Sequence, residues 1–192
     1  MRREGGREIG GIKGVFIDRD GTIGGTGHFI HPKDFSPYPF SRQAFALLKN
    51  HHIKMFACTN QHRISKGQAS IQDFQDEFQS YGFDDAFICP HSPEEGCHCH
   101  KPNPGLLWEA SRKHGIDLSR TAFIGDVGAT DMLAAHAVGA KKILVLTGWG
   151  ISSCTDYRHK WADIEPDYIA ENLLDAVKWI IQYNGEKTAL GL

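Results

Sequence analysis

The sequence predicts an α/β fold, a doubly wound, Rossmann-like parallel sheet flanked by helices. Short apolar runs alternate along the chain with amphipathic stretches, which is the pattern of strands joined by crossover helices. The length of 192 residues suits one domain of ordinary size. Hydrophobic residues make up 41% and charged residues 23% of the chain, fractions typical of a globular protein and not of a disordered one.

Six short apolar runs bounded by turn residues predict the strands. They are Lys13–Asp18, Ile53–Cys58, Ala86–Cys89, Ala122–Gly125, Lys142–Leu146 and Asp167–Ala170. In open α/β sheets the ligand binds beyond the carboxyl ends of the strands. Residues that directly follow these runs are therefore the candidates for chemistry.

Five helices are predicted between and after the strands from their apolar stripes and end signals. The predicted starts are a cap at Ser41, a cap at Ser70, a cap and first-turn proline at Asn103-Pro104, Asp131, and Glu171. The predicted ends are Gly82, Gly115, Gly139 and Tyr183. No internal repeat or linker divides the chain, and no large cap domain interrupts it, so we expect one domain over residues 12–185. Residues 1–11 are expected to be a flexible leader and residues 186–192 a frayed tail.

Composition also restricts the partners and the compartment. The formal net charge of −2 disfavours a nucleic-acid partner, and no apolar run is long enough to cross a bilayer. Five cysteines without an export signal argue against a disulfide scaffold and indicate the cytoplasm. We expect the partner to be a small molecule.

Asp18 and Asp20 follow the first predicted strand and enter a glycine turn. One aspartate at such a position can attack phosphorus and form an acyl phosphate. A second aspartate two residues later can protonate the leaving oxygen and then deprotonate water. The competing interpretation is an acidic turn that only ends a strand.

Thr59 and Asn60 follow the second predicted strand and offer neutral donors to an anion. Cys58 before them is expected to be a core residue. Lys101 precedes a predicted helix start, from which its ammonium could neutralise a phosphoryl group or Asp18. We expect Thr59, Asn60 and Lys101 to bind the phosphate.

Cys89 and His91 are followed by a Cys-x-Cys pair, Cys97 and Cys99. Three thiolates and one imidazole complete a tetrahedral set for Zn²⁺ and leave no open position, so the site should be structural. Ligation would also order a loop that has no core of its own. His98 and His100 are expected to point away from the metal, and a redox Cys-x-Cys pair is the competing interpretation.

Asp126 ends the fourth predicted strand, on the same edge as Asp18. Mg²⁺ prefers oxygen ligands from one or two carboxylates, the substrate phosphate and water. We expect Asp18 and Asp126 to provide the carboxylates, with a backbone carbonyl near Asp20 as a third protein ligand. Asp131 is expected to support this site from behind; the alternative is that it only complements a helix dipole.

Together, Asp-x-Asp-Gly-Thr, a strand-end threonine, a lysine and Gly-Asp-x-x-x-x-Asp resemble the haloacid dehalogenase-like (HAD) phosphatases. The Cys-Pro-His and Cys-x-Cys segments resemble the capless, zinc-bearing subclass, which contains the heptose bisphosphate and histidinol phosphate phosphatases. The resemblance implies that Asp18 is the nucleophile, Asp20 the acid and base, and Asp126 a magnesium ligand. It further implies that Thr59 and Lys101 contact the phosphoryl group. An arginine commonly precedes the lysine in this subclass, whereas this chain has His100.

The sequence therefore predicts a Mg²⁺-dependent phosphomonoesterase that acts on a small phosphorylated metabolite, such as a sugar phosphate, a sugar bisphosphate or histidinol phosphate. The alternatives are a zinc-stapled binding module without catalysis and a polynucleotide phosphatase. Without a cap, the substrate is expected to be shaped by the loops Gly24–Phe35, Gln61–Gln68 and Gly148–Asp163. Candidate contacts in these loops are His28, Phe29, His31, Arg63, Lys66 and Trp149.

Overall fold

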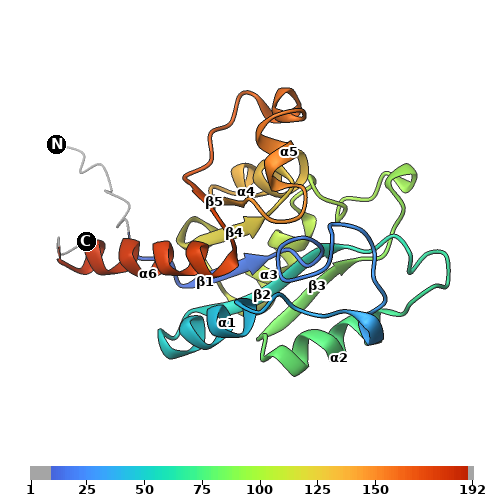
Figure 1. Cartoon of the computed structure of the whole chain (residues 1–192), viewed down its shortest axis with the longest axis horizontal. Helices are drawn as coiled ribbons and strands as arrows, with labels where there is room; N and C mark the ends of the chain where they lie inside the picture. The colour runs from blue at the N-terminus through green and yellow to red at the C-terminus, as the bar shows by residue number, and fades with distance from the viewer. Residues whose placement is uncertain (1–9, 190–192) are drawn as a thin grey trace.

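The computed structural model describes residues 10–189 and contains one six-stranded parallel sheet with helices on both faces (Figure 1). The strand order is β3-β2-β1-β4-β5-β6, which confirms the doubly wound α/β prediction. The strands are β1 Gly14–Ile17, β2 Lys54–Asn60, β3 Asp85–Cys89, β4 Thr121–Gly125, β5 Lys141–Val145 and β6 Tyr168–Ala170. All six lie within two residues of the predicted bounds.

Alternation along the central strands divides the apolar residues between two cores. In β1, Val15 and Ile17 belong to the core beneath α1 (Ser41–Asn50), α2 (Ile71–Tyr81) and α6 (Leu173–Ala189). Phe16 belongs to the other core, which is covered by α3 (Gly105–His114) and α4 (Leu133–Ala137). All three of these β1 side chains are fully buried, because a strand covered on both faces presents every side chain to a core.

Two predicted helix starts were wrong by one or two residues. Ser41 is the first residue of α1 instead of its cap, and its hydroxyl donates to the carbonyl of Ile23 at 2.7 Å. Helix α3 begins at Gly105, and the Asn103 amide instead donates to the carbonyl of Cys97 at 2.9 Å. In both cases a tertiary contact engages the polar side chain that a local cap would have used. The cap at Ser70 is confirmed, and Asp73 completes its capping box.

The chain after β4 differs more from the prediction. A π-helical turn over Gly128–Met132 precedes α4 (Leu133–Ala137). The helical segment predicted to start at Asp131 therefore starts three residues earlier, at Gly128, and its first turn is π-helical. A short helix, α5 Gly150–Cys154, lies within the predicted loop 148–163. Helix α6 continues to Ala189, so residues 186–189 of the predicted tail are helical, and the rest of it lies outside the described residues. The predicted leader lies largely in residues 1–9, outside the described residues.

The parallel register brings the ends of β1, β2 and β4 together. Ile17 pairs with Ala57 on one side and with Ile124 on the other, and the backbone N–H of Asp18 donates to Ile124 at 3.0 Å. Strand β2 continues two residues further than predicted, so Thr59 is the second-to-last residue of the strand and does not follow it. Across residues 10–189, no helix has the length and apolar character that crossing a membrane requires.

Candidate active site

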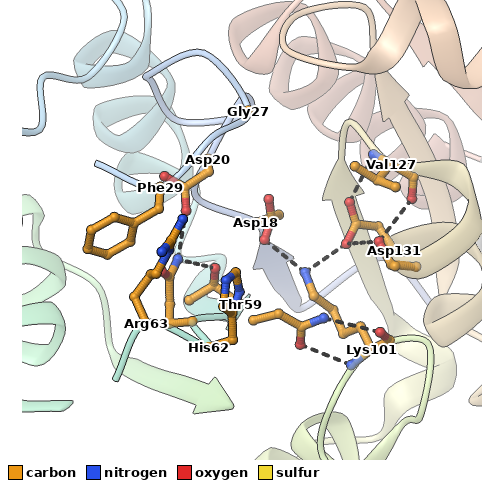
Figure 2. A pocket seen from close by; sticks show the side chains of 13 residues that line it. Asp18, Asp20, Gly27, Phe29, Thr59, His62, Arg63, Lys101, Val127 and Asp131 are labelled. Atoms are coloured by element: carbon orange, nitrogen blue, oxygen red, sulfur yellow. Dashed lines mark hydrogen bonds and ion pairs between the residues drawn. The ribbon is translucent and has the colours of Figure 1, made fainter. Parts of the chain in front are cut away.

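A pocket of about 220 Å³ opens at the carboxyl edge of the sheet (Figure 2). Its walls come from the ends of β1 and β2, the loop after β2, Lys101 and the turn after β4. Six of the predicted site residues line it: Asp18, Asp20, Thr59, Asn60, Lys101 and Asp131. The topology thus brings together Asp20 and Gln61, 41 positions apart, and Asp18 and Lys101, 83 positions apart along the chain.

The centre of the pocket is an ion-paired group around Lys101. Its ammonium donates to Asp18 Oδ1 at 2.8 Å, to Asp131 Oδ1 at 2.7 Å and to the carbonyl of Cys58 at 2.8 Å. Burial opposes the charge of Lys101, but Asp131 and Asp18 outweigh it and raise the pKa of the lysine. Burial also raises the pKa of the Cys58 thiol to about 12, which fits the predicted core role.

Three carboxylates, Asp18, Asp126 and Asp131, place oxygen atoms within 4.8 Å of one another. Burial, followed by repulsion from Asp18 and Asp131, raises the pKa of Asp126 well above its ordinary value. Lys101 pairs with Asp18 and Asp131 but not with Asp126, and this set of three carboxylates fits a divalent cation bound by hard oxygen ligands. Gly21, at φ +94°, lies against this group, because a Cβ there would collide with the Asp126 carboxylate.

Asp20 lies outside the three-carboxylate group. Its Oδ1 accepts a hydrogen bond from Arg19 Nη1 at 2.6 Å, and its Oδ2 accepts one from Gln61 Nε2 at 2.6 Å. Burial, only partly offset by Arg19, raises the pKa of Asp20 to about 6. A metal contact from Asp20 would therefore come from its backbone carbonyl, and its carboxyl group is left for proton transfer.

Arg19, between the two aspartates, has a role that the sequence analysis missed. It is fully buried, and its Nε and Nη2 donate to the carboxylate of Glu77 on α2 at 2.8–3.2 Å. Its guanidinium stacks 3.7 Å from the ring centroid of Phe35. The available signal was an arginine directly after an apolar strand and between two aspartates, because a charged group buried there needs a partner.

Gln61 connects the proton-transfer residue to the phosphate-binding wall. Its Nε2 also donates to Thr59 Oγ1 at 3.0 Å, so the Thr59 proton is free to be donated elsewhere. Asn60 is engaged with Lys101: its Oδ1 accepts from the Lys101 N–H at 3.0 Å and its Nδ2 donates to the Lys101 carbonyl at 3.1 Å. Asn60 therefore lines the pocket and also holds the backbone that carries the lysine.

The four predicted zinc ligands form one cluster. Ligand atoms of Cys89, His91, Cys97 and Cys99 all lie within 4.8 Å of one another. The neighbouring sulfur–sulfur distances are 3.4–3.6 Å, and His91 Nδ1 is 3.2 Å from Cys99 Sγ. Ligands about 2.0–2.3 Å from a tetrahedral ion lie roughly 3.5–3.8 Å apart. The donor set and its spacing therefore fit a closed Zn²⁺ site.

The two remaining histidines of this loop behave differently. His98 is exposed, as expected. His100 does not point away: its Nδ1 lies 3.8 Å from Cys89 Sγ, and burial lowers its pKa. The expectation from simple alternation was wrong for His100, because the segment from His98 to Lys101 is a bend and not a strand.

The loop residues expected to contact the substrate lie in different places. Phe29 and Arg63 line the pocket, together with His62, which the sequence analysis did not select (Figure 2). His31 and Lys66 are not among the residues that line the pocket; His31 lies 4.0 Å from Asp73 at the start of α2.

Trp149 borders a second cavity of about 350 Å³, which shares Gly27 and Val127 with the first pocket. His28 packs edge-on against the Trp149 ring, with the centroids 5.3 Å apart. The predicted loop 148–163 therefore contributes a wall of the cavity beside the pocket.

Comparison with known proteins agrees with this geometry. The HAD-hydrolase-like family profile matches residues 98–176. A D-glycero-beta-D-manno-heptose-1,7-bisphosphate 7-phosphatase of Helicobacter pylori strain J99 is 30% identical over 181 residues, covering 88% of this chain and 97% of that protein. The enzyme of the same name from Pseudomonas aeruginosa is 34% identical over 148 residues, covering 71% of this chain and 83% of that protein.

Solved structures give the same result. The D,D-heptose 1,7-bisphosphate phosphatase from B. bronchiseptica, complexed with magnesium and phosphate, matches with a TM-score of 0.74 at 28% identity. The match covers 89% of this chain and 99% of that one. The 3-deoxy-D-manno-octulosonate 8-phosphate phosphatase from Moraxella catarrhalis, at a TM-score of 0.61 and 19% identity, shares the fold.

Proposed function

The chain belongs to the HAD-hydrolase-like family, and from this we propose that it is a Mg²⁺-dependent phosphatase acting on a small phosphorylated sugar. The observation that carries the proposal is the contact between Asp18 and the buried ammonium of Lys101 at 2.8 Å, beside Asp126 and Asp131. This arrangement combines a carboxylate nucleophile with positive charge that offsets the charge of a transferring phosphoryl group.

In the first step, the Asp18 oxygen that points away from Lys101 attacks phosphorus, and the bond from phosphorus to the ester oxygen breaks (Figure 2). Asp20 donates a proton to the departing oxygen, which leaves as an alcohol. In the second step, water attacks the aspartyl phosphate, Asp20 takes up one proton of the water, and phosphate leaves Asp18. A pKa of about 6 suits Asp20 to both transfers near neutral pH.

Other side chains orient and neutralise the phosphoryl group. The ammonium of Lys101, held against Asp18, offsets the charge of the phosphoryl oxygens, and the free proton of the Thr59 hydroxyl can reach one of them. Mg²⁺ bound by Asp18, Asp126 and the Asp20 carbonyl, with Asp131 behind them, would offset the negative charge of the phosphoryl group.

We propose a sugar bisphosphate as the substrate, because the relatives that cover most of the chain are named for heptose 1,7-bisphosphate. We further propose that Cys89, His91, Cys97 and Cys99 hold a structural Zn²⁺. The cytoplasm is the proposed compartment, since a thiolate cluster with all five cysteines free is suited to a reducing environment.

The test is phosphate release from heptose 1,7-bisphosphate, other sugar phosphates, histidinol phosphate and an oligonucleotide 5′-phosphate. We expect Mg²⁺-dependent turnover on the sugar bisphosphate and a loss of about 10³-fold or more in Asp18→Asn, because no other side chain can form the acyl phosphate. Asp34→Asn, an exposed aspartate, is the matched control and should retain full activity.

Retention of turnover by Asp18→Asn would end the proposal. Zinc-bound protein that hydrolyses no phosphoester would favour a binding module, and preference for the oligonucleotide would favour a polynucleotide phosphatase.

A further inference from the structure

The cationic side chains in and beside the pocket differ in how many carboxylates they pair with. The ammonium of Lys101 is held by two carboxylates and a carbonyl, and the guanidinium of Arg19 by Glu77 and Asp20. Both side chains are essentially buried. Arg63, on the loop after β2, differs from them because no carboxylate within residues 10–189 pairs with its charge.

The contacts of Arg63 leave donors available. Its Nη1 donates to the neutral Gln68 Oε1 at 3.3 Å, and its guanidinium lies 5.9 Å from the Phe29 ring centroid. Its Nε is buried and has no hydrogen-bond partner within residues 10–189. A buried donor without a partner is disfavoured, so a ligand that accepts from it gains a hydrogen bond that the protein alone does not satisfy.

The surroundings of Arg63 add positive potential. His62 also lines the pocket, and its pKa is lowered by burial and then by the charges of Arg63 and Lys66. The side chains of Arg63 and Lys66 make this rim cationic. The rim faces Lys101 and Asp131 across the pocket, with Asp18 between them (Figure 2).

We propose that Arg63 binds a second anionic group of the substrate, so that the enzyme prefers bisphosphates to the corresponding monophosphates. The inference rests on the proposed function and adds the residue that selects the substrate. With the reacting phosphoryl group at Asp18, the second group is bound at the opposite wall by a planar guanidinium, which suits the oxygens of a phosphate. His100, where the resembled subclass commonly has arginine, does not provide this fork.

A competing position exists in the second cavity. Lys160 lies on its wall, with the ammonium 4.7 Å from the Tyr157 ring centroid. That cavity contains neither Asp18 nor Lys101. Arg63 is preferred because it shares one pocket with the nucleophile and retains a buried, unsatisfied donor.

The experiment compares kcat/KM for heptose 1,7-bisphosphate with that for heptose 7-phosphate in the wild type and in Arg63→Gln. We expect the wild type to favour the bisphosphate at least 10-fold. Arg63→Gln should lower this ratio to near one, mainly through a higher KM, and Arg63→Lys should restore part of it. Arg42→Gln, an exposed arginine on α1, should leave the ratio as in the wild type.

An equal loss of kcat/KM on both substrates in Arg63→Gln overturns the inference. The inference is also overturned if Lys160→Gln, and not Arg63→Gln, abolishes the preference for the bisphosphate. Binding of both sugars to Asp18→Asn, measured by calorimetry with and without Arg63→Gln, separates the two proposals. A wild type that binds the bisphosphate through Arg63 without hydrolysing it contradicts the proposed function alone. Equal affinities for both sugars contradict this inference even if turnover is observed.

Discussion

At the scale of single residues, Arg19 links the proton-transfer carboxyl group to a helix. It touches Asp20 through Nη1 and Glu77 through Nε and Nη2, so α2 fixes the direction in which the Asp20 carboxyl group points. The pair is nearly inaccessible, with side-chain exposures of 0% and 4%. Removing one partner of such a pair leaves a buried charge with less compensation.

We expect Glu77→Gln to impair protonation of the leaving group. Without the Glu77 charge, Arg19 is held by Asp20 alone and binds its ionised form more strongly. General acid–base catalysis contributes about 10²–10⁴-fold, and we expect a loss of roughly 10-fold or more on an alkyl phosphate. The loss on p-nitrophenyl phosphate should be smaller, because that leaving group departs without a proton.

Glu109→Gln on the exposed face of α3 is the matched control. Both variants should be compared at a temperature where circular dichroism reports full folding, since loss of a buried partner also lowers stability. Equal losses on the two substrates would assign Arg19 and Glu77 a structural role only.

At the scale of elements, the segment between β3 and α3 depends on its cysteines. It contains Pro93–Glu95 as a short 3₁₀ turn with no buried residue, so hydrophobic packing contributes little to its order. We expect about one zinc per chain in the purified protein and much less in Cys99→Ser, with a lower melting temperature, because ligation is coupled to folding of the loop. Elemental analysis and thermal unfolding measure both.

Cys154→Ser is the control for this experiment. Cys154 is half-buried and lies outside the cluster, so the variant should retain its zinc. Metal-free wild-type protein of unchanged stability would contradict the zinc assignment.

The edge strand β6 is fastened by an ion pair that gives a pH-dependent prediction. Burial opposes the charge of Asp167, but hydrogen bonds from Lys141 and Lys142 outweigh it and lower its pKa. The folded state therefore favours the carboxylate. Its contribution is complete above the ordinary pKa of 3.8 and is lost as the pH falls.

Asp167→Asn should destabilise the protein by about 0.5–1 kcal/mol at pH 7, and the difference from the wild type should shrink below about pH 4. Urea unfolding at several pH values measures this. Asp163→Asn, an exposed neighbour, should show no such difference. A constant difference at all pH values would exclude the ion pair as its cause.

At the scale of the whole molecule, the active site opposes folding in the absence of a metal ion. Asp18, Asp126 and Asp131 are buried together at one edge of the sheet, and burial, followed by repulsion from Asp18 and Asp131, raises the pKa of Asp126. We expect Mg²⁺ at about 100 times its dissociation constant to stabilise the fold by ~2.7 kcal/mol and to raise the melting temperature by about 5–10 °C.

Asp126→Asn should lose this shift and should be no less stable than the wild type without Mg²⁺, because it removes a repelled charge and keeps an acceptor for the Trp149 N–H. Asp156→Asn, an exposed aspartate, should retain the shift. A Mg²⁺ shift that persists in Asp126→Asn would refute this metal site.

Much of this site could be predicted from local patterns. The apolar runs identified all six strands, and the order of motifs along the chain placed Asp18, Asp126 and Lys101 at one edge, as the structure has them. The spacing of cysteines and His91 identified a cluster of four ligands. These features depend on residue type and strand periodicity, which the sequence contains in full.

Contacts between distant segments could not be predicted in this way. The sequence shows Arg19 and Glu77, but it does not show that they form an ion pair, because this pair forms only when α2 packs beside the end of β1. Nor does it show that the Asn60 amide, which lines the pocket, also holds the backbone of Lys101, 41 residues away. Polar side chains find their partners only after the sheet has fixed which strand ends are neighbours. Residue chemistry was thus determined by the sequence itself, and the pairing of those residues was decided by the tertiary structure.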